Sequence, residues 1–200
     1  MIGMLKKIYR KLLGQESNDS VQKLLKTGNI KVGTGCNIDS LKVSGHQFVN
    51  GKENIIIGDE CYLMCNIVLL NPNAKVKIGN RVFIAESIIY CYGEIEIQDD
   101  VMFSWDCTVI DTNAHSVTWA GRSNDVRDWL KGPQYKDWSN VQHGKIVIGQ
   151  KSWIGFKSII TKNVTIAEGT VVGCGSVVTK STEPFTVVGG NPAEFIKHTS

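Results

Sequence analysis

The chain has 200 residues, of which 42% are hydrophobic and 20% are charged, and its formal net charge is +3. This composition is typical of a folded soluble protein, and so small a positive charge does not indicate a nucleic-acid-binding protein. No apolar run reaches the ~20 residues of a transmembrane helix, and the N-terminus lacks an adequate secretory signal, so we expect a cytoplasmic location.

The first 28 residues are predicted to form a helical cap. In "MIGMLKKIYRKLLG" the apolar residues recur at helical spacing with basic residues between them. We interpret this segment as a helix that covers the first coil of the fold described below; the alternative is an interfacial helix in weak contact with anionic lipid. A second helix is expected in "DSVQKLLKTG", with Asp19 or Ser20 as its N-cap and Gly28 closing it.

Residues 29–183 carry a repeat of six residues, which is clearest in the second half of the chain. Counted from position 148, every sixth residue is a branched aliphatic: Ile148, Ile154, Ile160, Ile166, Val172 and Val178. Four positions after each of these stands a small or β-branched residue: Ser152, Ser158, Val164, Thr170, Ser176 and Thr182. A period of six fits neither a helix nor a simple hairpin, but it fits short strands that turn after each side of a triangle. We therefore predict a mainly β protein, a parallel β-helix whose coils stack ~4.8 Å apart; the period does not determine its handedness.

The same period appears upstream with interruptions. Its aliphatic and aromatic positions are Ile57, Leu63, Leu69, Ile78, Ile84, Ile97, Phe103 and Val109. Slips such as the one at "NPNA" (71–74) predict small loops at the corners. The stretch from Val109 to Ile148 is much longer than one coil, so we predict a long external excursion over residues 112–145. Residues 184–200 are expected to form a C-terminal extension.

The six cysteines show no Cys-x-x-Cys pair, and no Cys/His spacing is typical of a zinc site. They occupy positions 36, 61, 65, 91, 107 and 174. We expect all six to be reduced, mostly as small core residues, and we expect no metal cofactor.

Three tracts between residues of about 30 and 197 stand out: "DTNAHS", "IVIGQKSWIGFKSII" and "VVTKSTEPFTVVGGNPAEFIK". With these tracts, this part of the chain resembles the hexapeptide-repeat acyltransferases. Within the family the chain looks most like the polysaccharide and sugar O-acetyltransferases of the maltose/galactoside acetyltransferase type, whose long loop is similar to "SVTWAGRSNDVRDW" and "KDWSNV". The resemblance implies a left-handed β-helix, a homotrimer with active sites between subunits, and acetyl-CoA as co-substrate along the coils.

The resemblance also places a catalytic histidine where the chain leaves the solenoid, and His115 occupies that position. A sugar hydroxyl is a poor nucleophile, and a neutral imidazole can take its proton during attack on a thioester, which needs no metal. The alternative is an ordinary loop histidine. Asp111 and Asn113 are the candidate supports for the ring or the acceptor, or else polar residues that form the turn.

The candidate cofactor-binding residues are also carried over from the family. They are Trp153 beside the pantetheine arm, Gly155 and Cys174 where backbone amides meet it, and Thr179, Lys180 and Lys197 near the phosphates. Their alternatives are subunit packing for the tryptophan, corner geometry for the small residues and simple solvation for the lysines. Glu194 stands where several relatives carry a basic residue, which argues against a strong 3′-phosphate contact there.

The excursion combines aromatic and charged side chains of the kind that bind carbohydrate. Its candidate substrate-binding residues are Trp119, Arg122, Trp138 and His143. The alternative is that these residues pack the loop on a neighbouring subunit. For His143 we favour a structural role.

The predicted function is acetyl-CoA-dependent transfer of an acetyl group to a sugar hydroxyl in surface polysaccharide biosynthesis. The alternative is N-acetylation of a nucleotide-linked amino sugar. Antibiotic modification is less expected, because the loop typical of that branch is not found around His115. A non-catalytic β-helical scaffold and a zinc carbonic anhydrase, which needs three converging histidines, are weaker alternatives.

Overall fold

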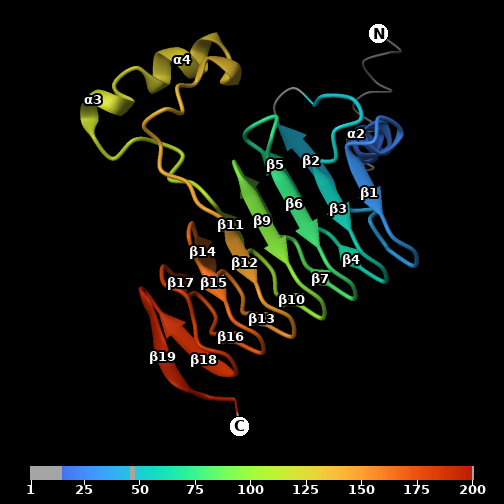
Figure 1. Cartoon of the computed structure of the whole chain (residues 1–200), viewed down its shortest axis with the longest axis vertical. Helices are drawn as coiled ribbons and strands as arrows, with labels where there is room; N and C mark the ends of the chain where they lie inside the picture. The colour runs from blue at the N-terminus through green and yellow to red at the C-terminus, as the bar shows by residue number, and fades with distance from the viewer. Residues whose placement is uncertain (1–14, 46–47, 200) are drawn as a thin grey trace.

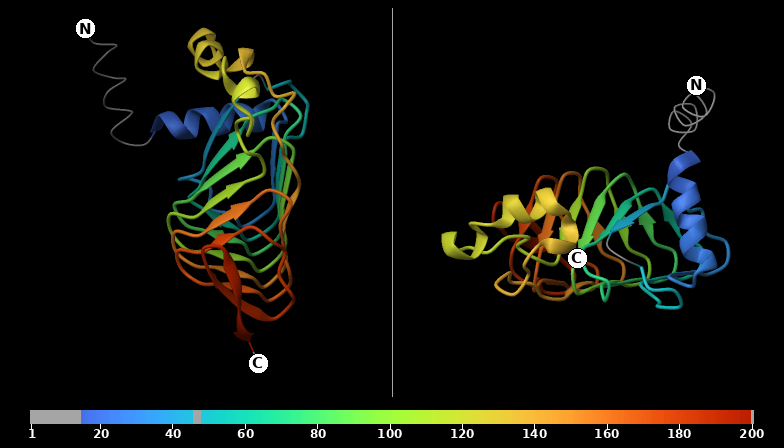
Figure 2. Two further views of the ribbon diagram at one scale, coloured as in Figure 1. Left: turned by 90° about the vertical axis from the view of Figure 1, so that its left-hand side faces the viewer. Right: turned by 90° about the horizontal axis from the view of Figure 1, so that it is seen from above.

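The computed structural model describes residues 15–45 and 48–199 of the chain. After helix α2 (Gln15–Lys26), short strands wind into a solenoid whose coils stack along one axis (Figure 1). The helix lies across the N-terminal end of the solenoid in both turned views (Figure 2). Between β11 and β12 the chain leaves the coils in an excursion that carries α3 (Trp119–Arg122), α4 (Asp125–Lys131) and the 3-10 helix η1 (Pro133–Tyr135).

Three sheets form the sides of the solenoid, and each coil contributes strands to them in turn. Sheet A contains β1 (Ile30–Val32), β3 (Ile55–Ile57), β6 (Lys75–Ile78), β9 (Glu94–Ile97), β12 (Ile146–Ile148) and β15 (Thr165–Ile166). Sheet B contains β4 (Tyr62–Leu63), β7 (Phe83–Ile84), β10 (Met102–Phe103), β13 (Trp153–Ile154), β16 (Val171–Val172), β18 (Thr186–Gly190) and β19 (Ala193–His198). Sheet C contains β2 (Lys42–Gly45), β5 (Asn66–Leu69), β8 (Ile88–Cys91), β11 (Thr108–Ile110), β14 (Ile159–Thr161) and β17 (Val177–Val178). All neighbours pair in parallel except β18 and β19, which form an antiparallel hairpin at the C-terminal end.

The predicted parallel β-helix is confirmed, and the aliphatic column with period six forms its core. The six predicted positions from Ile148 to Val178 are all buried, and so are the upstream positions from Ile57 to Val109. The second column, of small or β-branched residues, lies at the corners, where some of its hydroxyl groups bond to backbone carbonyls. Ser152 Oγ donates to the Ala167 carbonyl and Ser158 Oγ to the Gly173 carbonyl, each at 3.0 Å. One residue in six therefore fills the core, while a second satisfies the backbone where a strand ends.

Close stacking of the coils explains the glycines that follow several core isoleucines. A Cβ added at Gly149 would lie 2.7 Å from the Glu168 backbone nitrogen, and one at Gly79 would lie 2.9 Å from the Asp99 backbone nitrogen. Neighbouring coils approach too closely at this corner for a side chain, so the glycines follow from the stacking distance itself.

We expect Ile160→Ala to destabilise the protein by about 2–5 kcal/mol, because its fully buried side chain would leave a cavity between coils. Ile159 is the matched control: it is the preceding residue of the same strand and is 37% exposed, so Ile159→Ala is expected to cost less than about 1 kcal/mol. Urea unfolding of both variants measures the difference. Equal losses would contradict the assignment of the inward face.

Helix α2 packs on the first coil through Val21 and Leu24, which are buried. Gly28 closes the helix as predicted: its φ is +75°, and its N–H donates to the Leu25 carbonyl. The predicted N-cap is wrong, because the helix already includes Gln15 and so contains Asp19 and Ser20 in its interior. The predicted basic helix and its membrane alternative lie at residues 1–14, outside the described residues.

The six cysteines are unpaired, and Cys61, Cys65, Cys91 and Cys107 are buried in or beside the core. Burial raises the pKa of the Cys65 thiol to about 12, so that thiol stays protonated and unreactive at neutral pH. Within the described part of the chain, no helix combines the length and apolarity needed to cross a bilayer.

Candidate active site

The excursion leaves the solenoid after β11 and returns to it before β12, and it stands away from the coils (Figures 1 and 2). Its two ends are held together as a neck. Thr112 and His143 form an antiparallel bridge, and the Asn113 N–H donates to the Gln142 carbonyl at 2.9 Å. Two short segments paired in this way give the excursion a fixed base.

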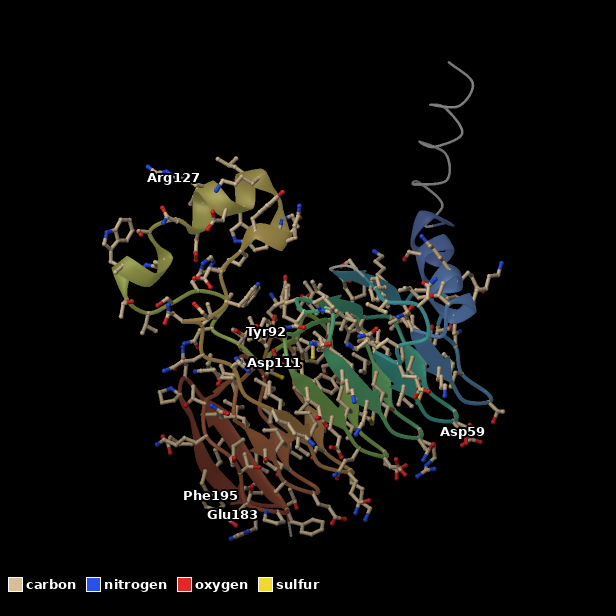
Figure 3. All side chains as sticks on the ribbon, turned by 45° about the horizontal axis from the view of Figure 1, so that its top comes forward. Asp59, Tyr92, Asp111, Arg127, Glu183 and Phe195 are labelled. Atoms are coloured by element: carbon tan, nitrogen blue, oxygen red, sulfur yellow. The ribbon has the colours of Figure 1, made fainter. Side chains whose placement is uncertain are left out.

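Asp111 anchors this neck to the preceding coil. Its side chain is fully buried, and its two carboxylate oxygens accept the backbone N–H groups of Tyr92 and Gly93, both at 2.7 Å. Figure 3 shows Tyr92 and Asp111 together at the base of the excursion. Burial raises the pKa of Asp111, although these two N–H groups oppose the shift. The Asp111 carboxylate is thus bonded to the backbone of another coil and not to the His115 ring, while its expected role in orienting the acceptor stays a prediction.

His115 lies on the excursion just beyond the neck. The turn that presents it is formed by Ala114, whose φ is +59°, and the His115 N–H donates to the Asn113 carbonyl at 2.6 Å. Asn113 thus contacts His115 through its backbone. The imidazole is 52% exposed, and its Nδ1 is hydrogen-bonded to Oδ2 of Asp125.

Asp125 is the first residue of α4 and is buried. An ionised carboxylate can only accept hydrogen bonds, so Nδ1 of His115 carries the proton and donates it. The lone pair of the ring is then on Nε2, for which the described residues provide no hydrogen-bond partner. This is the tautomer that a general base needs.

The same Asp125 oxygen accepts a second hydrogen bond, from the ammonium group of Lys136. Burial alone would raise the pKa of Asp125, but the hydrogen bonds from His115 and Lys136 outweigh it and hold this pKa below its ordinary value. Asp125 is therefore a carboxylate at neutral pH.

The aromatic residues of the neck pack on the solenoid. The rings of Trp138 and His143 lie 4.5 and 4.7 Å from that of Tyr92, centroid to centroid. Both are candidate substrate-binding residues, with a structural role favoured for His143, and the structure places them together at the base of the excursion. Trp138 also connects to the His115 network, because the Lys136 ammonium lies 5.7 Å from its ring centroid.

The other two predicted substrate residues lie on α3, away from this cluster. Trp119 is 72% exposed, and the Arg122 guanidinium lies 5.7 Å from its ring centroid. Arg122 also donates to the Val117 carbonyl at 2.7 Å, which ties its side chain to the start of the helix. The structure therefore separates the predicted substrate residues into two groups.

The predicted cofactor residues lie on the last coils. Trp153 is on the outer face of sheet B, 46% exposed, and its indole N–H donates to Ser104 Oγ at 3.1 Å. Cys174 is exposed at the corner that follows sheet B. The Gly155 N–H donates to the Val172 carbonyl at 2.8 Å and is not available to a ligand, so the place of this residue beside the pantetheine arm stays a prediction.

The predicted phosphate-binding residues lie near the C-terminal end, and all three are exposed. Thr179 and Lys180 follow β17, and Lys197 is on β19. Lys180 Nζ lies 3.9 Å from a carboxylate oxygen of Glu194, so the acidic residue noted in the sequence partly neutralises this group.

An apolar outer face runs along sheet B and its corner. Tyr62, Phe83, Met102 and Trp153 occupy aligned outward positions on successive strands. At the corner the rings of Trp105 and Phe156 stack with centroids 5.4 Å apart. Apart from Trp153, sequence reasoning missed this face, although its sheet positions directly precede the core residues of the repeat.

Asp125 and Lys136 were also missed as partners of His115. Their signal is weak in the sequence, because a helix and a 3-10 turn separate them within an aperiodic stretch. Among the described residues, no group of three or more His, Cys, Asp or Glu side chains is arranged to hold a metal ion. A groove of about 670 Å³ crosses the first residues of β2, β5, β8 and β11 on sheet C.

No protein-family model matches the chain. Among curated proteins, a chloramphenicol acetyltransferase of Agrobacterium fabrum is 34% identical over 89 residues, which are 39% of this chain and 43% of that protein. A dTDP-4-amino-4,6-dideoxy-D-glucose acyltransferase of Escherichia coli is 26% identical over 178 residues, covering 82% of this chain and 88% of that protein. The matches with chloramphenicol acetyltransferases span less than half of the length of those proteins.

Among solved structures, a variant of AntD, an N-acyltransferase from Bacillus cereus in complex with dTDP and coenzyme A, has a TM-score of 0.65. It is 27% identical, and the match covers 88% of both chains. The solenoid has the left-handed winding of such β-helical neighbours, as expected.

Proposed function

Since the chain belongs to the hexapeptide-repeat acyltransferase family, we propose that it transfers an acetyl group from acetyl-CoA to a sugar hydroxyl in surface polysaccharide biosynthesis. The observation that carries this proposal is the His115–Asp125 pair on the excursion. Its imidazole is half-exposed, its Nδ1–H is held by a buried carboxylate, and its Nε2 is free to accept a proton.

The pair performs the proton transfers of acyl transfer. Nε2 of His115 takes the proton of the acceptor hydroxyl as the hydroxyl oxygen attacks the thioester carbonyl carbon. Asp125 stabilises the imidazolium that forms, because it accepts the Nδ1–H bond as a buried carboxylate. The carbon–sulfur bond then breaks, and the imidazolium returns its proton to the leaving thiolate. No net proton or electron is left over.

Acetyl-CoA is the co-substrate of this proposal, and exposed groups of the last coils fit its chemistry. The outer indole face of Trp153 suits the apolar part of the pantetheine arm, and Cys174 lies at the next coil's corner. Thr179, Lys180 and Lys197 supply donors for the phosphates. The bound coenzyme A of AntD supports this choice of co-substrate.

The apolar outer face of sheet B supports a homotrimer. Large apolar side chains in a continuous row, of which Tyr62, Met102 and Trp153 are exposed, indicate a surface that another molecule covers. A second copy of this chain is the proposed partner, with the active site between subunits. We propose the cytoplasm as the location, because acetyl-CoA is made and used there.

A second candidate acceptor is the amino group of a nucleotide-linked sugar. The observation that favours it is the extent of the likeness: the dTDP-amino-sugar acyltransferase and AntD are matched over most of their length, unlike the chloramphenicol acetyltransferases. The His115–Asp125 pair serves this reaction equally, since an attacking amine also loses a proton.

An acceptor screen with acetyl-CoA tests the function. We expect mass spectrometry to detect acetylation of a saccharide in a panel of neutral oligosaccharides, dTDP-4-amino-4,6-dideoxy-D-glucose and chloramphenicol. Mild alkali then separates the two candidates, because it cleaves an ester and leaves an amide intact. Acetylation of chloramphenicol alone, or of nothing in a broad saccharide panel, would contradict the proposal.

A further inference from the structure

Lys136 is a buried lysine with a single carboxylate partner. It follows η1, and none of its side chain is exposed to solvent. Its ammonium group contacts Oδ2 of Asp125 and lies 5.7 Å from the centroid of the Trp138 ring. Burying an ammonium group is costly unless its surroundings compensate it. The free-energy cost of burying the Lys136 ammonium group therefore needs a structural explanation.

The geometry around Asp125 provides one. The Lys136 ammonium group and the Nδ1–H of His115 both donate to the same oxygen, Oδ2 of Asp125. The charged or titratable groups that face Lys136 are Asp125 in contact, His115 across the carboxylate, and Asp137 next in the chain. The ammonium group is in direct contact with the carboxylate, so it offsets part of the negative charge that the imidazole would otherwise face.

That offset matters for a general base. A bare carboxylate in contact with an imidazole stabilises the imidazolium ion, since an opposite charge nearby favours the charged form of the ring. An imidazolium ion has no free lone pair, so it cannot take the proton of the group that receives the acetyl. A carboxylate already paired with an ammonium group still accepts the Nδ1–H bond and orients the ring, but it stabilises imidazolium less.

The position of Lys136 is also fixed from the solenoid side. The Trp138 ring contacts both the ammonium group of Lys136 and the ring of Tyr92. The backbone of Tyr92 is in turn bound by Asp111. A continuous set of contacts therefore joins the coil to the carboxylate that orients His115.

Resting on the proposed function, we infer that Lys136 is a positioning residue for acyl transfer: its buried ammonium group holds Asp125 in place and offsets its charge, so that His115 remains a neutral proton acceptor. Because its side chain is not exposed to solvent, Lys136 acts on His115 through Asp125.

The test follows the titration of the His115 imidazole by NMR, assigned with His115→Ala. In Lys136→Met, which keeps the length of the side chain and removes its charge, we expect the midpoint to move to higher pH by about one unit or more. Lys136→Arg keeps the charge and is expected to keep the midpoint. Lys131→Met is the matched control, because Lys131 lies on the same excursion but is exposed and pairs with Asp128.

The pH profile of kcat/KM gives the second readout. Its acidic limb is expected to move to higher pH in Lys136→Met, with activity recovering at alkaline pH. The double variant Lys136→Met/Asp125→Asn removes both charges and is expected to return the midpoint towards that of the wild type. It also avoids an uncompensated buried charge if the single variant folds poorly.

An unmoved midpoint in Lys136→Met would overturn the inference, and so would a double variant whose midpoint equals that of a shifted single variant. A uniform loss of kcat with an unmoved acidic limb would overturn it as well, because it would indicate a structural role. The NMR readout needs no turnover. A shifted midpoint in a protein that acetylates no acceptor would therefore support the role of Lys136 in His115 protonation while contradicting the proposed function.

Discussion

His115→Ala is expected to lower kcat about 10²–10⁴-fold, because the acceptor would lose the general base that removes its proton. The ring is half-exposed and takes no part in the core, so the thermal midpoint should change little. Release of the coenzyme A thiol, followed with a chromogenic disulfide, measures the rate, and circular dichroism follows the fold.

The matched control is His198→Ala, which removes an exposed imidazole of β19 whose recorded ring contact is with Phe195. Its rate should equal that of the wild type. A His115→Ala enzyme with unchanged kcat would rule out the proposed base and would favour a mechanism in which the excursion only binds the acceptor.

Asp125→Asn is expected to lower kcat by up to about 10⁴-fold, the scale seen when an amide replaces the carboxylate that orients a catalytic histidine. The amide NH₂ group would face two donors, which disfavours the tautomer with the proton on Nδ1. The variant also leaves the buried Lys136 without a counter-charge, a change that typically costs about 3–5 kcal/mol. We expect this loss to loosen the excursion while the solenoid stays folded.

Hydrogen exchange measured separately for the excursion and for the coils would locate that loosening. Asp128→Asn is the matched control: Asp128 lies on the same short helix, and its recorded ion pair is with the exposed Lys131. Excursion amides that remain as protected in Asp125→Asn as in Asp128→Asn would contradict a structural role for the buried carboxylate.

The lowered pKa of Asp125 also leads to a prediction for the stability of the wild-type excursion in acid. Because its pKa is lowered in the folded protein, its stabilisation is fully present above the unfolded value of about 3.9. That stabilisation is lost as the pH falls through the lower folded value. Protection of the excursion should therefore fall with acidification in the wild type, and Asp125→Asn should lack this component.

The solenoid could be predicted from the sequence because its physics is local and repeated. Each core position, such as Ile154 or Ile160, lies in the same environment as the one six residues earlier, so the repeat itself reports burial. The winding direction could not be obtained in this way, since a period of six fits either hand. The role of Gly28 could be predicted because a glycine after an amphipathic segment commonly closes a helix. The start of α2 was misplaced, because Asp19 and Ser20 are typical N-cap residues but lie inside the helix.

The site could be predicted only in part. His115 was identified from its position at the break in the repeat together with the family resemblance. Asp111 was the natural choice of partner because it is close in sequence, but the neighbouring coil uses its carboxylate. Asp125 and Lys136 come from an aperiodic segment, where closeness in space depends on how the excursion folds back and leaves no regular pattern.

Gly155 illustrates the same limit for the co-substrate. A small residue at a corner is compatible both with a ligand approaching the backbone and with a tightly stacked coil. Its Cβ would lie 2.6 Å from the Val172 carbonyl oxygen, so the stacking accounts for the glycine. The sequence alone does not distinguish approach of a ligand from close stacking of the coils at this position.

The paired neck of the excursion has an evolutionary consequence. The chain leaves the coils at Thr112 and returns at His143, and these two residues face each other across a bridge, so the neck fixes the distance between the two ends of the excursion. A change in the length of the excursion can be accommodated beyond this neck, provided that contacts with the coil such as that of Trp138 with Tyr92 are kept. Variation at α3 and α4 can occur while the stacked coils keep their fold.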